Sequence, residues 1–419
     1  MSHYKPYPVY KDSGVEWLGR VPEHWGIRSV KTLARLDGGA GFPDDEQGQS
    51  DNPIPFFKVA ELASGLRYTA NTVTEETAKR LGAKIFPPST LVFAKVGAAL
   101  LLNRRCLLEM PACLDNNMMA LLPGAYESQW LYWVFSTLDM GLIANPGAVP
   151  SINQEQVGNI RLGVPTTAEQ KSISQRLGRE TARIDALIEK KTRFIELLRE
   201  KRQALITHAV TKGLDPDAKM KNSGVEWLGE VPEHWVVTTI SRLFEIKAGG
   251  DLKEEYYSEA PDETHCHPIY TNSVKSGAVY GYTSKAFYLP NTITVTGRGE
   301  IGHAVYREVA YDAIIRLLVL TPKSKAHCKY SAFFINAVLN FHGGNTAVSQ
   351  LSAEQIAPYI LLSPPEKEQV EISRYLDLEA SRIDNLIAKT ERSIDLLKER
   401  RSALITAAVT GQIDLREAV

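Results

Sequence analysis

The sequence lacks the residues and runs that mark several classes of protein. Four cysteines in 419 residues are too few for a disulfide framework, and no apolar run approaches the roughly 18 residues that cross a bilayer. The first residues contain no apolar signal core, so we expect a cytoplasmic protein without a membrane segment. The formal net charge of −1 excludes the strongly basic proteins that coat nucleic acid nonspecifically, so any nucleic-acid surface must be local.

Common catalytic motifs are also missing. The sequence has no phosphate loop of the form G-x-x-x-x-G-K-[ST] and no G-x-S-x-G nucleophile elbow. The histidines and cysteines at 265–267 and 327–328 are too closely spaced for one zinc ion, whose ligands usually lie two to four residues apart, so we expect no metal site. A long chain without a catalytic signature is expected to bind rather than to catalyse.

Two internal repeats are present, and they have different offsets. The phrase SGVEWLGRVPEHW at 13–25 recurs at 223–235, with Arg20 replaced by Glu230. A longer repeat at 169–211 recurs 199 residues later at 368–410. The middles, at about 26–150 and 236–349, share little sequence. The repeats predict a duplicated scaffold that carries two inserts that are not duplicated.

The longer repeat predicts a long amphipathic helix in each half. Apolar residues recur at spacings of three, four and seven with charged residues between them, which is typical of coiled-coil pairing. Pro165 and Pro364 precede the two segments, and Gly213 and Gly411 follow them, as expected at helix boundaries. The predicted packing residues are Leu177, Ile184, Ile188, Ile195, Leu198 and Leu205, and their counterparts Leu376, Ile383, Ile387, Ile394, Leu397 and Leu404.

Chain order predicts that the two helices form an antiparallel coiled coil. The first middle precedes the first helix and the second middle follows it, so a paired second helix must return along the first. About 40 residues at 1.5 Å each give a rod of roughly 60 Å. Leu187 and Leu386 fall in the same apolar pattern and are expected on the paired face. The alternative, that each helix packs only on its own domain, does not explain why both are long.

The middles are typical of mixed α/β domains. Short apolar runs separated by Gly, Asn and Pro predict strands and tight turns, and an apolar stretch in each middle predicts a helix. The predicted fold class is mixed α/β (α+β), with two globular domains, two long helices and a pseudo-two-fold internal repeat. We place the domains at 1–165 and 214–365. We place the helical segments at 166–213 and 366–419, the latter with a C-terminal tail.

Polar and basic residues on the turns of the middles are candidate DNA contacts. Glycine lets a backbone approach a ligand, arginine or lysine can bind phosphate or guanine, and asparagine can read adenine. The alternative for each is a turn residue that hydrogen-bonds its own loop. The candidates are Lys95, Arg104, Arg105, Asn116, Asn272, Ser273, Lys275, Arg298 and His303.

Each copy of the thirteen-residue phrase also contains two tryptophans. Trp17 and Trp25 in the first copy correspond to Trp227 and Trp235 in the second. Large amphipathic side chains of this kind either anchor the chain in a core or contact a partner protein, and the sequence leaves both roles open.

The order of these parts resembles the specificity subunit of type I restriction–modification systems. The resemblance is carried by "GVEWLGRVPEHW" at the start of a module, by "IDALIEKK" and "LLREKRQALITHAVT" at its end, and by their recurrence over the whole chain. It implies that each middle is a target recognition domain that reads one half of a bipartite, asymmetric site in double-stranded DNA. It also implies that the helices set the gap between the halves and dock methyltransferase (modification) subunits, of which we expect two.

The resemblance further implies a non-catalytic subunit in a larger complex that includes restriction/translocase subunits. S-adenosylmethionine, ATP and Mg²⁺ are then expected on partner subunits and no cofactor on this chain. One alternative is a fusion with its own methyl transfer, but its Asn/Asp-Pro-Pro-Tyr/Phe motif is not found. Another is a scaffold or anti-restriction decoy that binds the methyltransferase through its coiled coil and binds no DNA.

Overall fold

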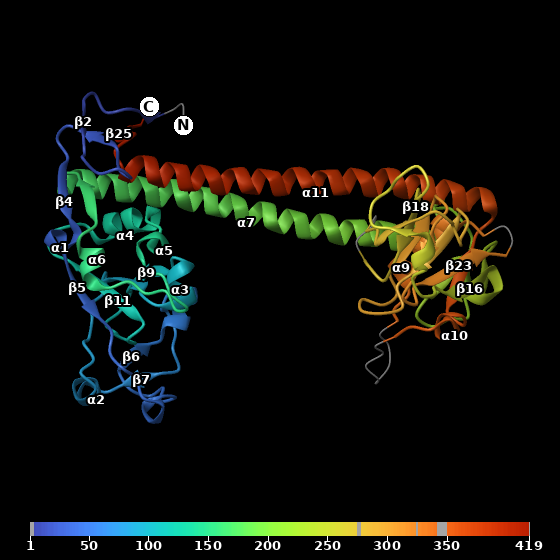
Figure 1. Ribbon diagram of the computed structural model, residues 1–419, viewed down its shortest axis with the longest axis horizontal. Helices are drawn as coiled ribbons and strands as arrows, with labels where there is room; N and C mark the ends of the chain where they lie inside the picture. The colour runs from blue at the N-terminus through green and yellow to red at the C-terminus, as the bar shows by residue number, and fades with distance from the viewer. Residues whose placement is uncertain (1–3, 275–277, 324–325, 342–349, 419) are drawn as a thin grey trace. The chain divides into compact units, whose positions relative to one another are not determined.

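The computed structural model describes residues 4–418 except 275–277, 324–325 and 342–349, and it divides into two compact units (Figure 1). Unit 1 comprises Met1–Lys190 and Ser393–Val419, and unit 2 comprises Lys191–Arg392. Each long helix therefore contributes to both units. Within the described residues, no helix combines the length and the apolar character that a membrane crossing requires.

Two long helices confirm the helical segments predicted from the second repeat. Helix α7 (Thr167–Lys212) has 46 residues and α11 (Glu366–Val409) has 44. Gly213 and Gly411 follow them with φ of +82° and +75°. This left-handed conformation ends a helix with little strain only at glycine, which explains the residue type at both positions.

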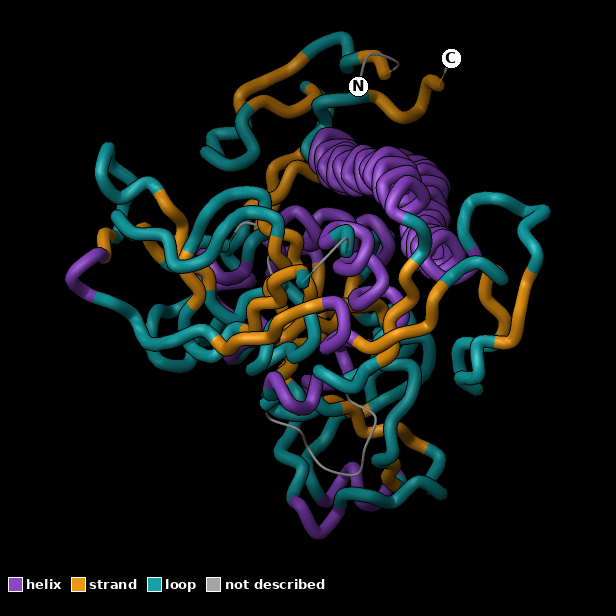
Figure 2. Tube along the Cα trace, turned by 90° about the vertical axis from the view of Figure 1, so that its right-hand side faces the viewer, coloured by secondary structure: helices purple, strands orange, loops and turns teal. Residues whose placement is uncertain are grey.

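The helices run antiparallel and lie side by side (Figure 1), and Figure 2 views them nearly along their axes. In unit 2, Arg199 of α7 contacts Glu391 of α11 at 3.3 Å, and Arg202 contacts Asp384 at 3.0 Å. A later residue of α7 thus lies opposite an earlier residue of α11. This direction is the one that chain order predicts.

One ion pair in each unit reflects the repeat. Asp185 of α7 accepts a hydrogen bond from Arg401 of α11 at 2.8 Å in unit 1, and Arg202 pairs with Asp384 in unit 2. Asp384 is the counterpart of Asp185, and Arg401 is the counterpart of Arg202, since each pair of positions lies 199 residues apart. The two contacts are therefore the same contact made twice, as a pseudo-two-fold repeat requires.

The predicted packing residues on the helices are all buried or half-buried, and Leu177 and Leu376 are completely buried. Leu187 and Leu386 differ from the expectation, because they are 43% and 42% exposed. At 100° per residue, both lie on the flank of the apolar stripe, where the partner helix no longer covers them.

Unit 1 contains a four-stranded antiparallel sheet in the order β5-β11-β8-β9. Helix α4 (Ser128–Thr137) packs on this sheet, and its Trp130 and Phe135 are fully buried. A smaller sheet, β10-β6-β7, lies with α2 (Glu75–Arg80) at the end of the unit away from the long helices (Figure 1). The sheet strands are β5 (Ala34–Gly38), β6 (Ile54–Phe57), β7 (Thr72–Val73), β8 (Leu91–Ala94), β9 (Arg105–Leu107), β10 (Cys113–Leu114) and β11 (Met118–Pro123).

The other elements of unit 1 are short. They are β1 (Tyr4–Lys5), β2 (Tyr10–Asp12), β3 (Arg20–Pro22), β4 (Gly26–Ser29), α1 (Val30–Leu33), η1 (Asp44–Glu46), η2 (Val59–Ser64), α2 (Glu75–Arg80), α3 (Gly97–Leu101), α5 (Met140–Ile143), α6 (Gln154–Gly158), β12 (Arg161–Val164) and β25 (Asp414–Ala418). Strand β12 pairs with β4 where the chain enters and leaves the middle, and β1 pairs with β25.

Unit 2 contains a four-stranded antiparallel sheet in the order β16-β23-β20-β21, with α9 (Cys328–Val338) packed on it. Its second sheet has the order β17-β19-β18-β22. The strands are β16 (Phe244–Ala248), β17 (Tyr257–Ser258), β18 (His267–Tyr270), β19 (Gly281–Thr283), β20 (Thr292–Val295), β21 (Ala304–Arg307), β22 (Asp312–Ala313) and β23 (Leu318–Pro322). The other elements are β13 (Met220–Asn222), β14 (Glu230–Pro232), β15 (Val236–Thr239), α8 (Ile240–Leu243), η3 (Glu254–Tyr256), α10 (Ala353–Ile356) and β24 (Ile360–Ser363).

The two middles share one topology, so the prediction that the inserts are not duplicated is wrong at the level of fold. The order β5-β11-β8-β9 in unit 1 corresponds to β16-β23-β20-β21 in unit 2. In both units a parallel pair, β6 with β10 or β18 with β22, builds the second sheet. A core needs apolar residues of suitable volume rather than particular ones, so a common fold persists where little sequence identity remains.

The repeated segments, 13–25 and 223–235, each pack where one long helix ends and the other begins. We call this packing contact the joint of each unit. Trp25 and Trp235 are both fully buried. In unit 1, a Cβ added to Gly411 at the end of α11 would lie 2.3 Å from Pro22, so the segment fits closely there. In unit 2, a Cβ added to Gly213 at the end of α7 would lie 3.3 Å from Trp235 and 4.0 Å from Pro232, so the corresponding residues lie nearby with more space. The thirteen residues recur because both joints have the same shape.

Two consecutive residues at the start of each long helix complete the joint. The Nε2 atoms of His24 and His234 lie 2.9 and 2.8 Å from carboxylate oxygens of Glu169 and Glu368. The next residue in each helix is a buried glutamine, Gln170 or Gln369. Its Oε1 atom accepts a hydrogen bond from the backbone N–H just before α4 or α9, at 3.0 Å in both units. The long helix thereby holds both the repeated segment and the first helix after the sheet.

Candidate nucleic-acid interface

In each unit, two chain segments cross closely at one end of the main sheet. We call the turns at this crossing the loop cluster, which comprises the turns around 38–39, 95 and 115–117 in unit 1 and around 249, 272, 297–298 and 314–317 in unit 2. In unit 1, Gly39 follows β5 and donates to Met118 O at 3.1 Å, and a Cβ there would lie 1.9 Å from Asp115 O. In unit 2, Gly249 follows β16 and a Cβ would lie 2.5 Å from Ala313 O. Only glycine permits this approach. The turn between β10 and β11, or between β22 and β23, is thereby fixed against the edge of the main sheet.

In unit 1 this crossing brings Lys95 and Asn116 together. Lys95 follows β8, and its backbone N–H donates to Asn117 O at 2.9 Å. Its Nζ atom would lie 3.4 Å from a Cβ at Gly38, so the lysine extends over that glycine. Asn116 is exposed at the tip of the neighbouring turn. Among the described residues, the Lys95 ammonium has no ion pair, so it is available to a phosphate or a base.

The two adjacent arginines of unit 1 have different surroundings. Arg104 is half-buried beside the end of β8. The Arg105 guanidinium instead donates to Asn103 O at 2.9 Å and to Leu138 O at 3.3 Å, and its buried Nη1 has no partner within the described residues. Burial lowers the pKa of Arg105 to about 10, with no carboxylate in hydrogen-bonding contact. Arg105 therefore belongs to the packing between β9 and α4 more than to an open surface.

In unit 2 the Asn272 side chain is engaged within the fold. Its Nδ2 donates to Ile315 O at 2.5 Å, and its Oδ1 accepts from the N–H groups of Gly297 at 2.7 Å and Arg298 at 3.2 Å. Ser273 is half-buried next to it, with its backbone N–H bonded to Thr271 O. The alternative that such a residue bonds its own loops thus describes Asn272 better than direct reading of adenine.

The remaining candidates of unit 2 lie on or near the same loops. Arg298 is exposed, and its Nη2 lies 3.5 Å from Gln350 Oε1. His303 is half-buried, and burial together with the charge of Arg307 lowers its pKa, which favours the neutral ring. Lys275 lies outside the described residues.

Arg316, which is not among the DNA contacts predicted from the sequence, is exposed at the turn between β22 and β23. Its neighbours in "AIIRLLVL" are apolar, so the segment resembles one uninterrupted strand. The turn has no Gly, Pro or Asn to reveal it, and only the structure places Arg316 beside Arg298 and Asn272.

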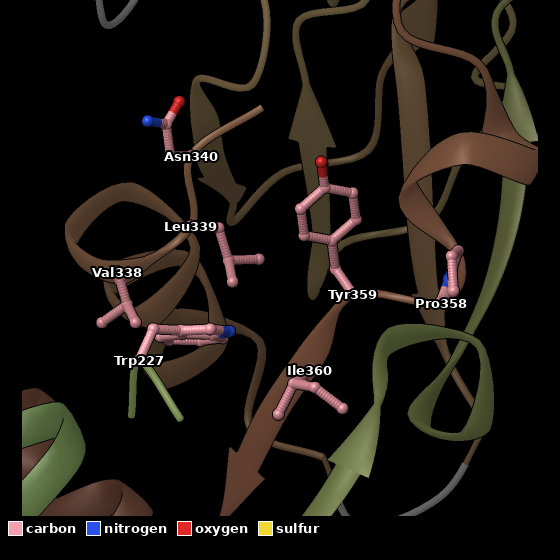
Figure 3. Close-up of a pocket in the computed structure, with 7 residues that line it drawn as sticks. All are labelled: Trp227, Val338, Leu339, Asn340, Pro358, Tyr359 and Ile360. Atoms are coloured by element: carbon pink, nitrogen blue, oxygen red, sulfur yellow. The ribbon is translucent and has the colours of Figure 1, made fainter. Parts of the chain in front are cut away.

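An apolar cavity of about 510 Å³ lies in unit 2 at the end of α9. It is lined by Trp227, Val338, Leu339, Asn340, Pro358, Tyr359 and Ile360. Figure 3 shows the Trp227 indole beside Val338, the last residue of α9, and beside Leu339. Trp227 and its counterpart Trp17 are 56% and 43% exposed, whereas the other tryptophan of each repeated segment is buried. The buried Trp25 and Trp235 therefore have the core role that the sequence left open, whereas contact with a partner stays a prediction for Trp17 and Trp227.

The histidine and cysteine cluster has ordinary structural contacts. His265 bonds Asp262 at 2.8 Å, and the buried Cys328 donates to Asn291 O at 3.1 Å. Over the described ranges, no group of three or more His, Cys, Asp or Glu residues is arranged to hold a metal ion.

Comparison with known proteins identifies the family. The family described as "Type I restriction modification DNA specificity domain" matches residues 232–398. A Mycoplasma pneumoniae sequence named as the C-terminus of a type I specificity subunit is 30% identical over 118 residues, which cover 28% of this chain and 81% of that sequence. The chain belongs to the family of type I restriction–modification specificity subunits.

Longer matches agree with this assignment. Another Mycoplasma pneumoniae type I specificity subunit is 25% identical over 251 residues, 60% of this chain, and the chain spans 64% of that relative's length. A solved chain from a study of complex assembly and conformational transition of the type I restriction–modification system has a TM-score of 0.74. It is 13% identical and covers 94% of this chain and 99% of its own length, which shows a common fold.

The specificity-subunit family is defined by DNA specificity and not by a reaction. This definition agrees with the loop clusters, which present lysine, arginine and asparagine side chains on rigid turns.

Proposed function

We propose that this chain is the DNA sequence-recognition subunit of a type I restriction–modification complex, and that each unit reads one half of a bipartite, asymmetric site. One observation supports this above the others. Both units have the same strand order and the same joint, but their loop clusters carry different side chains. An asymmetric two-part site requires two recognition domains with different contact residues, and a common fold allows both domains to be held in the same way.

The antiparallel helices act as the spacer between the two half-sites in this proposal. Continuous helices of 46 and 44 residues are stiff elements, and their contacts recur under the repeat. A stiff rod of about 69 Å for 46 residues would fix the number of unread base pairs.

Two modification subunits supply the methyl transfer in the proposed complex, and restriction/translocase subunits supply cleavage. S-adenosylmethionine, ATP and Mg²⁺ would bind those partners, in the cytoplasm where chromosomal DNA is accessible. The exposed Trp17 and Trp227 support two equivalent docking sites, because they occupy matching positions in nearly identical segments. The alternative of a decoy that binds no DNA is not favoured, because it gives no role to the two loop clusters.

A segment exchange tests this proposal. Residues 26–150 would be replaced by the corresponding segment of another family member, and the complex with its modification subunits would be expressed in cells that lack other methylation. Sequencing of methylated bases should reveal a motif with one half changed and the other half and the gap unchanged. A complex that assembles but methylates no specific motif, and shows no gel shift with genomic fragments, would support the decoy instead.

A further inference from the structure

The turn between β22 and β23 in unit 2 has a strained backbone. A hydrogen bond from Leu317 N to Ile314 O (3.2 Å) closes the turn, and its central residues Ile315 and Arg316 have φ of +54° and +59°. Two consecutive positive φ angles are the signature of a type I′ turn, which favours Asn and Gly. A β-branched isoleucine is an outlier there, so its surroundings must impose the conformation.

In the corresponding turn of unit 1, the residue types favour a left-handed backbone, but the turn does not adopt one. It is closed by a hydrogen bond from Met118 N to Asp115 O (3.1 Å), and its central residues are Asn116 and Asn117. Asparagine tolerates positive φ well, but neither residue is among those of the described chain that have it. The left-handed geometry thus occurs where the residues disfavour it, which points to a functional constraint on the turn of unit 2.

The Asn272 amide imposes this geometry and joins the turn to a second loop. Its donation to Ile315 O and its acceptance from Gly297 N and Arg298 N use both ends of the amide. A Cβ at Gly297 would lie 2.9 Å from Arg316 O, so glycine is required for the two loops to approach. One side chain therefore fixes the spacing of the Arg298 and Arg316 backbones.

Both arginine side chains are exposed and retain donors for a ligand. Within the described residues, the Arg298 guanidinium has one weak hydrogen bond, to Gln350 Oε1 at 3.5 Å, and Arg316 has no ion pair. Glu300 lies on the Arg298 loop and is exposed as well, but it forms no salt bridge with either arginine in the part of the chain that the structure describes.

We propose that Arg298 and Arg316 are the specificity-determining pair of unit 2, each donating two hydrogen bonds to O6 and N7 of a guanine in the major groove. Asn272 is the positioning residue that sets their spacing. A planar guanidinium matches the guanine edge with two parallel bonds, but only if its loop is held rigidly. The inference rests on the proposed function and specifies which residues carry it in unit 2.

The test uses the full chain assembled with its modification subunits. Arg298→Ala and Arg316→Ala should each relax one base position of one half-site, with about 5- to 150-fold loss of preference for the guanine. The other half-site and the gap should stay unchanged. Arg242→Ala, an exposed residue of α8 outside the three joined segments, removes the same charge from the same unit and should leave the motif intact.

Two substitutions at Asn272 separate positioning from general stabilisation. Asn272→Asp keeps an acceptor for Gly297 N and Arg298 N but cannot donate to Ile315 O, so the position that depends on Arg316 should relax while the one that depends on Arg298 persists. Asn272→Ala should relax both positions. If Asn272 had a merely structural role, its substitution would lower the melting temperature and the overall affinity, but the recognised motif would stay unchanged.

Each other outcome is decisive. A uniform loss of binding to all sequences, with the salt dependence reduced by about one ion, would show that the arginines bind phosphates and would overturn the inference. An unchanged motif in the arginine variants would overturn it as well. A wild-type complex without any preferred motif would overturn the proposed function itself.

Discussion

At the scale of single residues, Glu169 and Gln170 show that the residues repeated in the sequence make the contacts of the joint. The carboxylate contacts His24 of the repeated segment, and the amide accepts the backbone N–H that precedes α4. The same pair of contacts recurs in unit 2. Repetition in the sequence thus marks the joints, whereas Lys95 and Arg316, which face outward, have no matching counterpart. The residues of the joints can be predicted because they are identical in the two halves of the sequence. The contact residues differ between the halves, so only their chemical type suggests them.

Glu169→Gln should lower the free energy of unfolding by about 1–3 kcal/mol at pH 7, because a nearly buried carboxylate loses its charge-assisted hydrogen bonds. Urea unfolding of the full chain measures the loss. Glu189→Gln, an exposed residue of the same helix, is the matched control and should change stability little. An equal effect of both substitutions would contradict a special role for the joint.

The same carboxyl predicts a pH dependence. Burial acts to raise the pKa of Glu169, but hydrogen bonds from His24 and Thr166 outweigh it and lower the pKa below its usual 4.5. A group whose pKa is lowered on folding stabilises above the unfolded value and loses that contribution as the pH falls through the folded value. Stability of the wild type should therefore fall more steeply than that of Glu169→Gln below about pH 4.5, in unfolding curves measured at successive pH values.

At the scale of elements, the spacing of apolar residues predicts the long helices well and the short strands poorly. The repeated apolar stripe predicts both long helices, because forty residues give many turns of one consistent pattern. Strands of two to six residues give no such average, so the sequence does not predict the common topology of the middles. Helix α3, with the sequence GAALL, is likewise too short and too uniformly apolar to show a helical period.

Two leucines on one helix test the assignment of its faces. Leu177→Ala should cost about 2–5 kcal/mol, because the side chain is fully buried and leaves a cavity. Leu187→Ala removes the same atoms from a side chain that is 43% exposed and should cost much less. Denaturant unfolding of the two variants provides the comparison. Similar losses would mean that Leu187 belongs to the paired face, as the sequence pattern alone suggests.

At the scale of the whole molecule, the proposed spacer makes a quantitative prediction. Deleting seven residues from α7 and the corresponding seven from α11 keeps the apolar stripe in phase and shortens the helices by about 10 Å. The gap between half-sites should shrink by about three base pairs while each half-sequence is retained. The motif read by methylation sequencing gives both quantities. Deletion in one helix only should disrupt the pairing and the complex.

The exposed tryptophans predict where modification subunits dock. Trp17→Ala and Trp227→Ala together should weaken co-purification of these subunits by at least tenfold with little change in melting temperature, since both side chains are partly exposed. Trp235→Ala, which removes a fully buried ring from the same segment as Trp227, should instead destabilise the chain. Normal co-purification by the double variant would assign the exposed pair to another role.

The matching joints have a consequence for how such a chain could change its target. Since β4 with β12 and β15 with β24 attach the two middles to nearly identical supports, either middle should fit at either position. Under the proposed function, a chain given two copies of one middle would recognise a site made of two copies of one half-sequence, because each support holds one recognition domain. New sequence preferences could then arise by exchange of whole cassettes, without redesign of any contact that keeps the protein folded.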